Sequence, residues 1–423
     1  MREYKGPVPN NAQIKYHEEE MSAFMHFGMN TFTEVEWGNG KEKLEDFKLK
    51  HFDFDGYVKF IKEIGFKRLI FTAKHHDGFC MFDSKYTDHK ITNTSYGKDF
   101  FAELSEACTK YDLDMGCYLS PWDVHENTYG TGEAYNRYYL NQLEEICNNP
   151  KYGNNGKFVE WWFDNAKDPR YKDQVYDFDL WIDAVKKNNP EMLLFGVGSR
   201  GGVHWLGNEM GYAPEENAPR LQKKEDMTID YSTEFKSRDG HNENYVWSVP
   251  EADTCTTSGW FSHPEEKLKS VEELKNIYLK SVGRGAVLLL NIAPNKEGGI
   301  RQELKDNIIE FKNTINREFS NKLNEKFKIT NTENNEGRTI IINIEDIKEQ
   351  KINYIVLQED IKYGSRFKEG YIFVNEERIN IPSIGAKRII KIDNNQYSEK
   401  AIYNIRIELN GEGRLILKEI SIY

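Results

Sequence analysis

The segment VEWWFDNA, residues 159–166, decides how the rest of the chain is interpreted. It joins a short apolar and aromatic run, typical of a buried strand, to a carboxylate, Asp164. Burying a carboxylate without partners is costly, so packing alone does not explain Asp164. One alternative is an aspartate that caps the next helix. The other is a functional group at a strand end, and other strand-like segments favour it because several also end in polar or aromatic residues.

Strand-like and helical segments alternate along most of the chain. Besides residues 159–166, the strand-like segments are 23–30, 68–73, 115–120, 192–197, 228–233, 244–249 and 285–294, of which 228–233 and 244–249 are the weaker two. The first helical segment between them has Tyr57, Phe60, Ile61 and Ile64 on one face. Alternation of this kind indicates a parallel sheet, and eight repeats favour a (β/α)8-like barrel.

A change of pattern near residue 323 predicts a second domain. Short β-branched and aromatic runs recur there between polar turns: residues 339–344, 352–357, 371–374, 388–392, 401–409 and 414–418. Short strands at regular spacing predict an antiparallel β-sandwich. The expected organisation is therefore α/β, with a barrel at residues 1–322 and a C-terminal β-sandwich at 323–423. Such a sandwich could bind sugar, but support for the barrel is the commoner role.

Composition and charge exclude several classes of protein. The formal net charge of -12 argues against nucleic acid or an anionic membrane surface as the partner. Aromatic residues make up 13% of the chain, which suits both a large core and stacking against sugar rings. The five cysteines are scattered and read as free thiols. We find no run of 18 apolar residues and no apolar leader, so we expect a cytoplasmic protein, unless a leader has been removed from a secreted one.

Polar residues at the carboxyl ends of the predicted strands are expected to form the active site. They are His26, His75, His76, Tyr118, Asp164 and Asn291. The pair His75-His76 invites a metal interpretation, but adjacent strand residues point to opposite faces. We therefore expect the two imidazoles to bind different hydroxyl groups, and we expect neither a metal nor a cofactor.

Hydrolysis of a glycosidic bond with retention needs a nucleophilic carboxylate and a proton donor about 5–5.5 Å apart. Asp164 is the candidate nucleophile because a strand end holds it stiffly. Glu209, Glu251 and Asp253 are candidate donors on loops, although a loop carboxylate is most often a solvated surface charge. Glu209 is favoured because nearby Trp205 could shield it from water and raise its pKa, as an acid requires.

Three motifs of the predicted barrel resemble the α-L-fucosidases of glycoside hydrolase family 29. They are KHHDGF at residues 74–79 with DSKYT at 83–87, WFDNA at 162–166, and LLLNIAP at 288–294. The resemblance implies a retaining enzyme with a (β/α)8-like barrel, a following β-sandwich and Asp164 as nucleophile. It also implies fucose-binding positions at His26, His75, His76, Tyr118 and Trp162, and a pair, Glu36-Trp37, that closes the fucose site.

Further segments resemble the subfamily specific for α-1,3/1,4-linked fucose: residues 207–211, 250–253 and 259–261. In that subfamily the residue matching Glu209 is the general acid/base, and Glu251 and Trp260 become candidates for lining the pocket. Two positions depart from the family pattern. Asn165 stands where Gly is common, and CTTS at residues 255–258 replaces a segment that often carries an arginine, which puts recognition beyond the fucose in question.

The sequence therefore predicts an exo-acting, retaining α-L-fucosidase that releases terminal, α-1,3/1,4-linked fucose from oligosaccharides or glycoconjugates. Its expected partner is a fucosylated glycan. The alternatives are a broad-specificity α-L-fucosidase, a glycosidase for another deoxy or galacto-configured sugar, a fucose-binding protein that has lost catalysis, and a metal hydrolase. The presence of both Asp164 and Glu209 weighs against lost catalysis. The oligomeric state does not follow from the sequence.

Overall fold

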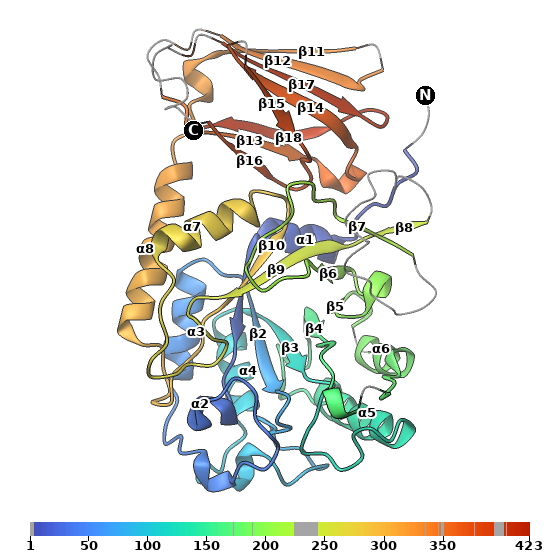
Figure 1. The fold of residues 1–423 in the computed structure, drawn as a ribbon, viewed down its shortest axis with the longest axis vertical. Coiled ribbons are helices and arrows are strands. Elements are labelled where there is room, and N and C mark those ends of the chain that lie inside the picture. Colours follow the sequence, from blue (N-terminus) through green and yellow to red (C-terminus); the bar gives the residue numbers. More distant parts are fainter. Residues whose placement is uncertain are drawn as a thin grey trace.

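The computed structural model describes residues 4–171, 173–187, 189–223, 244–334, 336–345, 347, 351–375, 377–392, 402 and 404–423. A barrel of parallel strands comes first in the chain and antiparallel sheets follow it. The two parts lie end to end along the long axis of the molecule (Figure 1).

Eight strands form the barrel in the order β5-β4-β3-β2-β1-β10-β9-β6, and the paired neighbours are all parallel. They are β1 (Met21–Met25), β2 (Arg68–Lys74), β3 (Asp114–Leu119), β4 (Glu160–Trp162), β5 (Leu193–Phe195), β6 (Val203–Trp205), β9 (Val249–Cys255) and β10 (Val287–Asn291). A parallel bridge between Leu194 and Gly202 brings β5 beside β6, so the barrel is nearly closed. The predicted fold class is confirmed.

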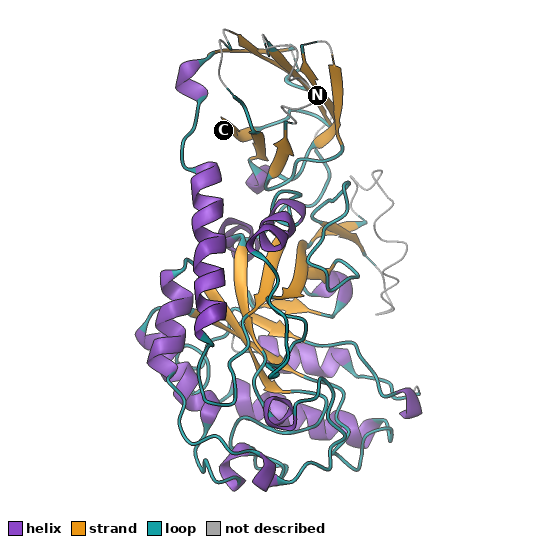
Figure 2. Ribbon diagram, turned by 60° about the vertical axis from the view of Figure 1, so that its left-hand side comes forward, coloured by secondary structure: helices purple, strands orange, loops and turns teal. Residues whose placement is uncertain are grey.

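Helices surround the barrel: most lie around its outside, and α1 lies across the end where the strands begin (Figures 1 and 2). They are α1 (Asn11–Glu19), α2 (Met29–Thr33), α3 (Phe54–Glu63), α4 (Phe100–Lys110), α5 (Glu133–Cys147), α6 (Phe178–Lys186), α7 (Val271–Lys280) and α8 (Gln302–Phe319), with short 3-10 helices at Leu44–Asp46, Ile91–Asn93, Pro169–Tyr171, Gly198–Arg200, Asn324–Lys326 and Ile361–Tyr363. Asp177 caps α6, the α-helix that follows β4, by accepting a hydrogen bond from the N–H of Leu180. Asp164 is therefore not the cap of that helix.

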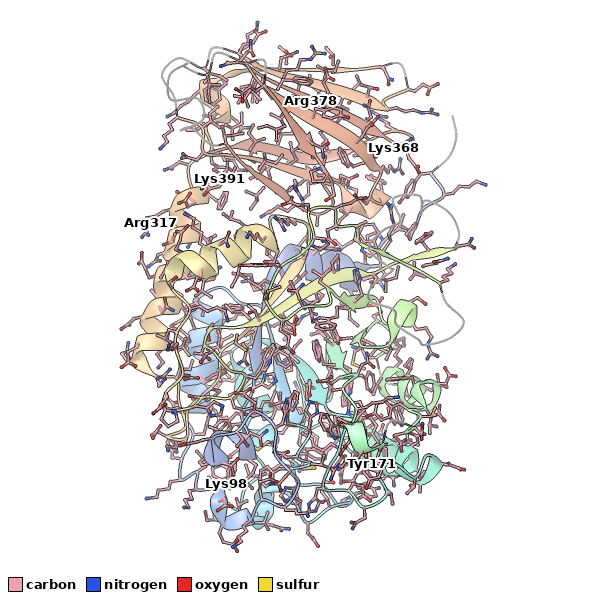
Figure 3. The ribbon with its side chains drawn as sticks, in the orientation of Figure 1. Lys98, Tyr171, Arg317, Lys368, Arg378 and Lys391 are labelled. Carbon is pink, nitrogen blue, oxygen red and sulfur yellow. The ribbon has the colours of Figure 1, made fainter. Side chains whose placement is uncertain are left out.

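The barrel strands are buried on both faces, as expected of a parallel sheet covered by helices. Every residue of β1, β2, β9 and β10 is buried. Charged side chains such as Lys98, Arg317 and Lys368 lie exposed on the outside of the molecule (Figure 3). Within the described part of the chain, no helix has the length and apolar character needed to cross a membrane.

Two predicted barrel strands differ from the structure. Residues 228–233 lie outside the described residues, and within 244–249 the strand β8 (Tyr245–Trp247) pairs antiparallel with β7 (Arg220–Gln222) instead of joining the barrel. β6 and β9 take the two barrel positions. Glu251 and Asp253 therefore belong to a buried strand, and their predicted place on a loop is wrong. The two acidic residues of β9 made its sequence resemble that of a loop.

Two antiparallel sheets follow α8, in the orders β11-β12-β17-β14-β15 and β16-β13-β18. Their strands are β11 (Lys328–Glu333), β12 (Thr339–Glu345), β13 (Tyr354–Glu359), β14 (Phe367–Val374), β15 (Glu377–Ile381), β16 (Arg388–Lys391), β17 (Ile405–Gly411) and β18 (Leu417–Ile422). Inward-facing side chains of both sheets, mostly isoleucines, share one core, as in a β-sandwich. The predicted boundary at residues 322–323 falls between α8 and β11.

The sandwich packs against the end of the barrel where the strands begin (Figure 1). Lys387 contacts Glu20, the residue before β1, and the N–H of Ile389 donates to the carbonyl of Gly283 at 2.8 Å. Arg388 donates to the carboxylate of Glu215 at 2.7 Å. The opposite end, where the barrel strands finish, stays clear of the sandwich.

Candidate active site

A cavity of about 350 Å³ lies at the carboxyl ends of the barrel strands, a size typical of small-ligand sites. It is lined by Phe24, His26, Trp37, His75, His76, Tyr118, Trp162, Asp164, Asn165, Ala166, Phe195, Trp205, Glu209, Asp253 and Trp260. The fold thus brings together most of the residues predicted for the site, although they are scattered over more than half of the chain. Glu36, Glu251 and Asn291 do not line the cavity.

Asp164 follows β4 and points into the cavity with about a quarter of its side chain exposed (26%). The Tyr118 hydroxyl donates to its Oδ2 at 2.9 Å, and the N–H of Ala166 donates to its Oδ1 at 2.8 Å. Burial raises the pKa of Tyr118 well above its usual value, so this hydroxyl keeps its proton and remains a donor. The carboxylate is therefore held in one orientation while staying accessible to a ligand.

Gly196 allows the end of β5 to approach the chain directly before Asp164. It has φ +81°, and a Cβ at this position would lie 1.8 Å from the carbonyl oxygen of Phe163. The Asn165 side-chain amide donates to the Gly196 carbonyl at 3.0 Å. Any side chain at residue 196 would push β5 away from this segment and displace Asp164.

Three imidazoles line the cavity and are fixed through their Nδ1 atoms. His26 Nδ1 lies 3.0 Å from Asn291 Oδ1, and His76 Nδ1 lies 2.7 Å from Ser120 Oγ. His75 Nδ1 lies 3.4 Å from Asn30 Nδ2. The predicted site residue Asn291 thus supports His26 from behind the wall of the cavity.

Burial keeps these imidazoles neutral. It lowers the pKa of His26 to about 3, and it lowers the pKa of His75 and His76 below the usual value. His76 Nε2 lies 3.7 Å from Asp164 Oδ2. A neutral imidazole with its Nδ1 engaged can offer its Nε2 to a ligand hydroxyl group. Hydroxyl binding by these histidines stays a prediction.

Glu209 lies on the loop after β6, at the mouth of the cavity. Burial, together with the negative charges of Asp164 and Glu36, raises its pKa, while a hydrogen bond from the Trp260 indole N–H (3.4 Å) opposes that rise. The sequence predicted Trp205 as the aromatic neighbour of Glu209. In the structure Trp205 and Glu209 line the same cavity, but the Trp205 indole N–H donates to Asp253 Oδ1 at 2.7 Å, and the indole that donates to Glu209 is that of Trp260.

Of the pair Glu36-Trp37, only Trp37 lines the cavity. Trp37 lines the cavity at its rim, 67% exposed, with its ring edge-on to that of Trp122. Glu36 does not line the cavity; its carboxylate, 38% exposed, accepts hydrogen bonds from the N–H of Trp260 at 2.9 Å and from His263 Nε2 at 2.7 Å. Glu36 therefore fixes the segment that carries Trp260.

Glu251 is a correction to the predicted site. It is fully buried beneath the cavity, where its carboxylate accepts hydrogen bonds from the Trp162 indole N–H at 2.8 Å and from the Tyr16 hydroxyl. The prediction that Glu251 lines the pocket is wrong, because residues 251 and 253 of β9 lie at different depths in the barrel. Its burial also argues against Glu251 as the proton donor.

Aromatic residues form the floor of the cavity, and the sequence analysis identified only part of them. The rings of Trp162 and Phe195 stack with centroids 3.6 Å apart, and Phe24 packs beside Trp162 at 5.3 Å. Phe24 and Phe195 were missed as site residues. Alternation along β1 was the available signal, since Phe24 is two residues from His26 and shares its face.

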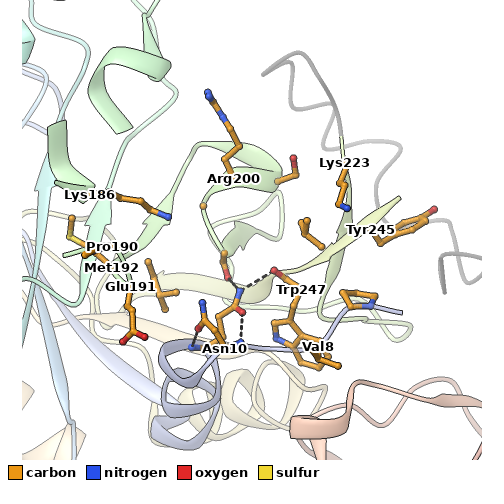
Figure 4. Close-up of a pocket in the computed structure, with 17 residues that line it drawn as sticks. Val8, Asn10, Lys186, Pro190, Glu191, Met192, Arg200, Lys223, Tyr245 and Trp247 are labelled. Carbon is orange, nitrogen blue, oxygen red and sulfur yellow. Dashed lines mark hydrogen bonds between the residues drawn. The ribbon is translucent and has the colours of Figure 1, made fainter. Parts of the chain in front are cut away.

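Other features of the described residues carry less chemistry. No group of three or more His, Cys, Asp or Glu among them is arranged to hold a metal ion. A second cavity of about 390 Å³ lies beside the start of α1, where Asn10, Arg200 and Trp247 are among the lining residues (Figure 4). It contains one carboxylate, Glu191, and so lacks the pair that a glycosidase needs.

The comparisons with known proteins agree on one family. The Alpha-L-fucosidase family profile matches residues 5–316. The chain is 36% identical over 323 residues to Alpha-L-fucosidase 1 of Arabidopsis thaliana, covering 76% of this chain and 62% of that protein. It is 35% identical over 308 residues to a putative alpha-L-fucosidase 1 of Oryza sativa subsp. japonica, covering 72% and 58%. The chain thus spans less than two thirds of the length of these two relatives.

Solved structures extend the similarity to the whole chain. A GH29 fucosidase of Ruminococcus gnavus in complex with fucose superimposes with a TM-score of 0.88 and 34% identity, covering 100% of this chain and 96% of that one. A putative alpha-L-fucosidase of Bacteroides ovatus gives 0.83 and 30%, covering 98% and 74%. Together with the cavity described above, these similarities show that the chain belongs to the α-L-fucosidases of glycoside hydrolase family 29.

Proposed function

We propose that this protein is a retaining, exo-acting α-L-fucosidase that hydrolyses terminal α-1,3/1,4-linked fucose in oligosaccharides or glycoconjugates. One observation carries the proposal: Asp164 and Glu209 line the same cavity, which also presents neutral imidazoles and an aromatic floor. A retaining glycosidase needs such a carboxyl pair, and fucose offers both hydroxyl groups and an apolar methyl group to the wall.

In the proposed reaction Asp164 attacks the anomeric carbon and forms a covalent glycosyl-enzyme. Glu209 donates its proton to the departing glycosidic oxygen, and the raised pKa of Glu209 favours this protonated form. Glu209 then removes a proton from water, which attacks the anomeric carbon and releases Asp164. Two displacements return the sugar with its original configuration.

The structure supports exo-action and the linkage through different features. The aromatic floor closes the cavity from below, which suits entry of a chain-terminal sugar. The proposed linkage rests on the resemblance of residues 207–211, 250–253 and 259–261 to the subfamily specific for that linkage. Segments 207–211 and 259–261 meet in the fold, because the Trp260 indole contacts Glu209.

Linkage is tested with two substrates, an α-1,3/1,4-fucosylated Lewis-type trisaccharide and an α-1,2-fucosylated oligosaccharide. We expect fucose release from the first and at most slow release from the second. Equal rates on both would instead support a broad-specificity α-L-fucosidase. Fucose binding without release from either sugar or from an aryl fucoside would support a binding protein that has lost catalysis.

The role of Glu209 is tested by rescue with azide. Glu209→Ala should lose most of its turnover of an aryl α-L-fucoside and regain part of it when azide replaces water as the second nucleophile. General acid–base groups typically contribute about 10²–10⁴-fold. The matched control is Glu251→Gln, which azide should not rescue. Rescue of the control alone would contradict the assignment of Glu209.

A further inference from the structure

A third carboxyl group, that of Asp253, faces the cavity in addition to those of Asp164 and Glu209. Asp253 lies in β9 and lines the cavity although only 3% of it is exposed. Side chains alternate along a strand, so Asp253 and Glu251 share the face of β9 that points into the barrel. The mechanism proposed above gives Asp253 no role.

One oxygen of Asp253 is fixed by the protein and the other is open to the cavity. The Trp205 indole N–H donates to Oδ1 at 2.7 Å. The backbone N–H of Asp253 also acts on its own carboxyl group. None of the described side chains donates to Oδ2, and Oδ2 is not among the unpartnered atoms that are sealed from solvent. A nearly buried carboxyl oxygen needs a hydrogen-bonding partner, since leaving it without one is costly. The cavity is where that partner can bind.

The depth of Asp253 indicates which part of a glycan it would contact. Glu209 lies exposed at the mouth of the cavity, where the glycosidic oxygen must pass. Asp253, by contrast, is nearly buried in the cavity wall, and we expect the terminal sugar to bind at this depth. The strand order also places β9 across the barrel from β3, which carries Tyr118. Asp253 would therefore contact the sugar on the side of the cavity opposite Tyr118.

The electrostatics of the pocket suit this contact. Burial raises the pKa of Asp253 to about 7; the Trp205 N–H opposes the rise, and the charges of Glu209 and Asp164 add to it. Below neutral pH Asp253 is therefore mostly protonated and can donate a hydrogen bond. Above neutral pH it is mostly ionised and can only accept one. A sugar hydroxyl group both donates and accepts hydrogen bonds, so either form can bind it.

We propose that Asp253, held by Trp205, is a substrate-binding residue whose Oδ2 forms a hydrogen bond with one hydroxyl group of the terminal sugar. This inference rests on the proposed function and adds a polar contact on the wall opposite Tyr118. It also explains why the Trp205 indole turns to β9 rather than to Glu209.

The test is a cycle that removes the carboxyl group and the hydroxyl group in turn. Wild type and Asp253→Ala are assayed on an aryl α-L-fucoside and on its 2-, 3- and 4-deoxy analogues. Loss of a hydrogen bond to a charged group predicts a fall in kcat/KM of about 10- to 100-fold for the parent substrate. For one analogue the fall should largely disappear, because that analogue already lacks the partner hydroxyl.

An equal loss on the parent and on all three analogues would overturn the proposal, as would no loss on any of them. Trp205→Phe keeps the ring but removes the N–H, and we expect a smaller loss that fades on the same analogue. If Asp253→Ala does not fold, as judged by thermal melting, Asp253→Asn takes its place in the cycle. A wild type inactive on every fucoside would instead contradict the proposed function.

Discussion

At the residue scale, indole N–H groups hold three carboxyl groups on one side of the barrel. Trp260 donates to Glu209, Trp205 to Asp253 and Trp162 to Glu251. An indole is a donor only, so it fixes a carboxyl oxygen without exchanging a proton with it. These contacts also favour the ionised form of each carboxyl group. Each indole thus opposes the rise in pKa that burial causes.

The Glu209 contact predicts a pH shift in Trp260→Phe. Losing the N–H removes a group that lowers the pKa of Glu209, so that pKa rises further. Because Glu209 must be protonated to act as the acid, the alkaline limb of kcat/KM should move to higher pH. The matched control is Trp37→Phe, a ring of the same cavity with no hydrogen bond to Glu209. A limb that stays in place in Trp260→Phe, or moves equally in the control, would contradict this assignment.

The types of residue at the strand ends predicted much of the pocket, but the hydrogen-bond partners of these residues did not follow from the sequence. His26, Tyr118 and Asp164 were found because they follow apolar runs, where a barrel places its active site. The hydrogen bond from Trp260 to Glu209 depends on how two loops fold back over the barrel. Sequence distance favoured Trp205, which is only four residues from Glu209, whereas tertiary structure brings Trp260 to it.

At the element scale, the composition of each strand and of its flanks determined which strands could be predicted. β2 and β10 are long and apolar and were predicted close to their observed bounds. β4, β5 and β6 have three residues each, but β4 and β5 lie within longer apolar runs, whereas β6 does not. β9 carries two acids that accept hydrogen bonds from tertiary partners. Local patterns cannot reveal such partners, so β9 looked like a loop.

A buried ionic cluster joins β2, β4 and α1 near the strand starts. Arg68 Nη1 donates to Glu160 Oε2 at 2.7 Å, and Arg68 Nε lies 3.1 Å from Glu19 Oε2. The guanidinium lies 3.8 Å above the ring of Tyr16, whose hydroxyl contacts Glu251. The cluster therefore connects the base of the barrel to the floor of the cavity through Glu251 and Trp162.

Removing the central cation should destabilise the barrel strongly. Arg68→Ala leaves Glu19 and Glu160 buried without their partner, and we expect a loss of about 3–5 kcal/mol in the free energy of unfolding. Arg317→Ala is the control, because Arg317 is exposed and pairs with exposed Glu310, a contact worth about 0–1 kcal/mol. Urea unfolding measures both. Equal, small losses would mean that the Arg68 cluster does not stabilise the barrel.

At the scale of the whole molecule, the sandwich packs against one end of the barrel and the cavity lies at the other. The sandwich covers the end where the strands begin, and its described residues contribute nothing to the lining of the catalytic cavity. The role of the sandwich as support for the barrel stays a prediction. The carboxyl ends of the strands remain open to a glycan.

The most direct test of the central claim, that Asp164 is the nucleophile of a retaining fucosidase, is to trap the glycosyl-enzyme. A 2-deoxy-2-fluoro fucosyl fluoride slows release of the sugar from the enzyme, so the covalent adduct should accumulate. Mass spectrometry of the digested protein should then find one added fluorofucosyl group on the peptide that contains Asp164, and none in Asp164→Asn. A label on another carboxylate, or rapid inactivation without any covalent label, would contradict the account.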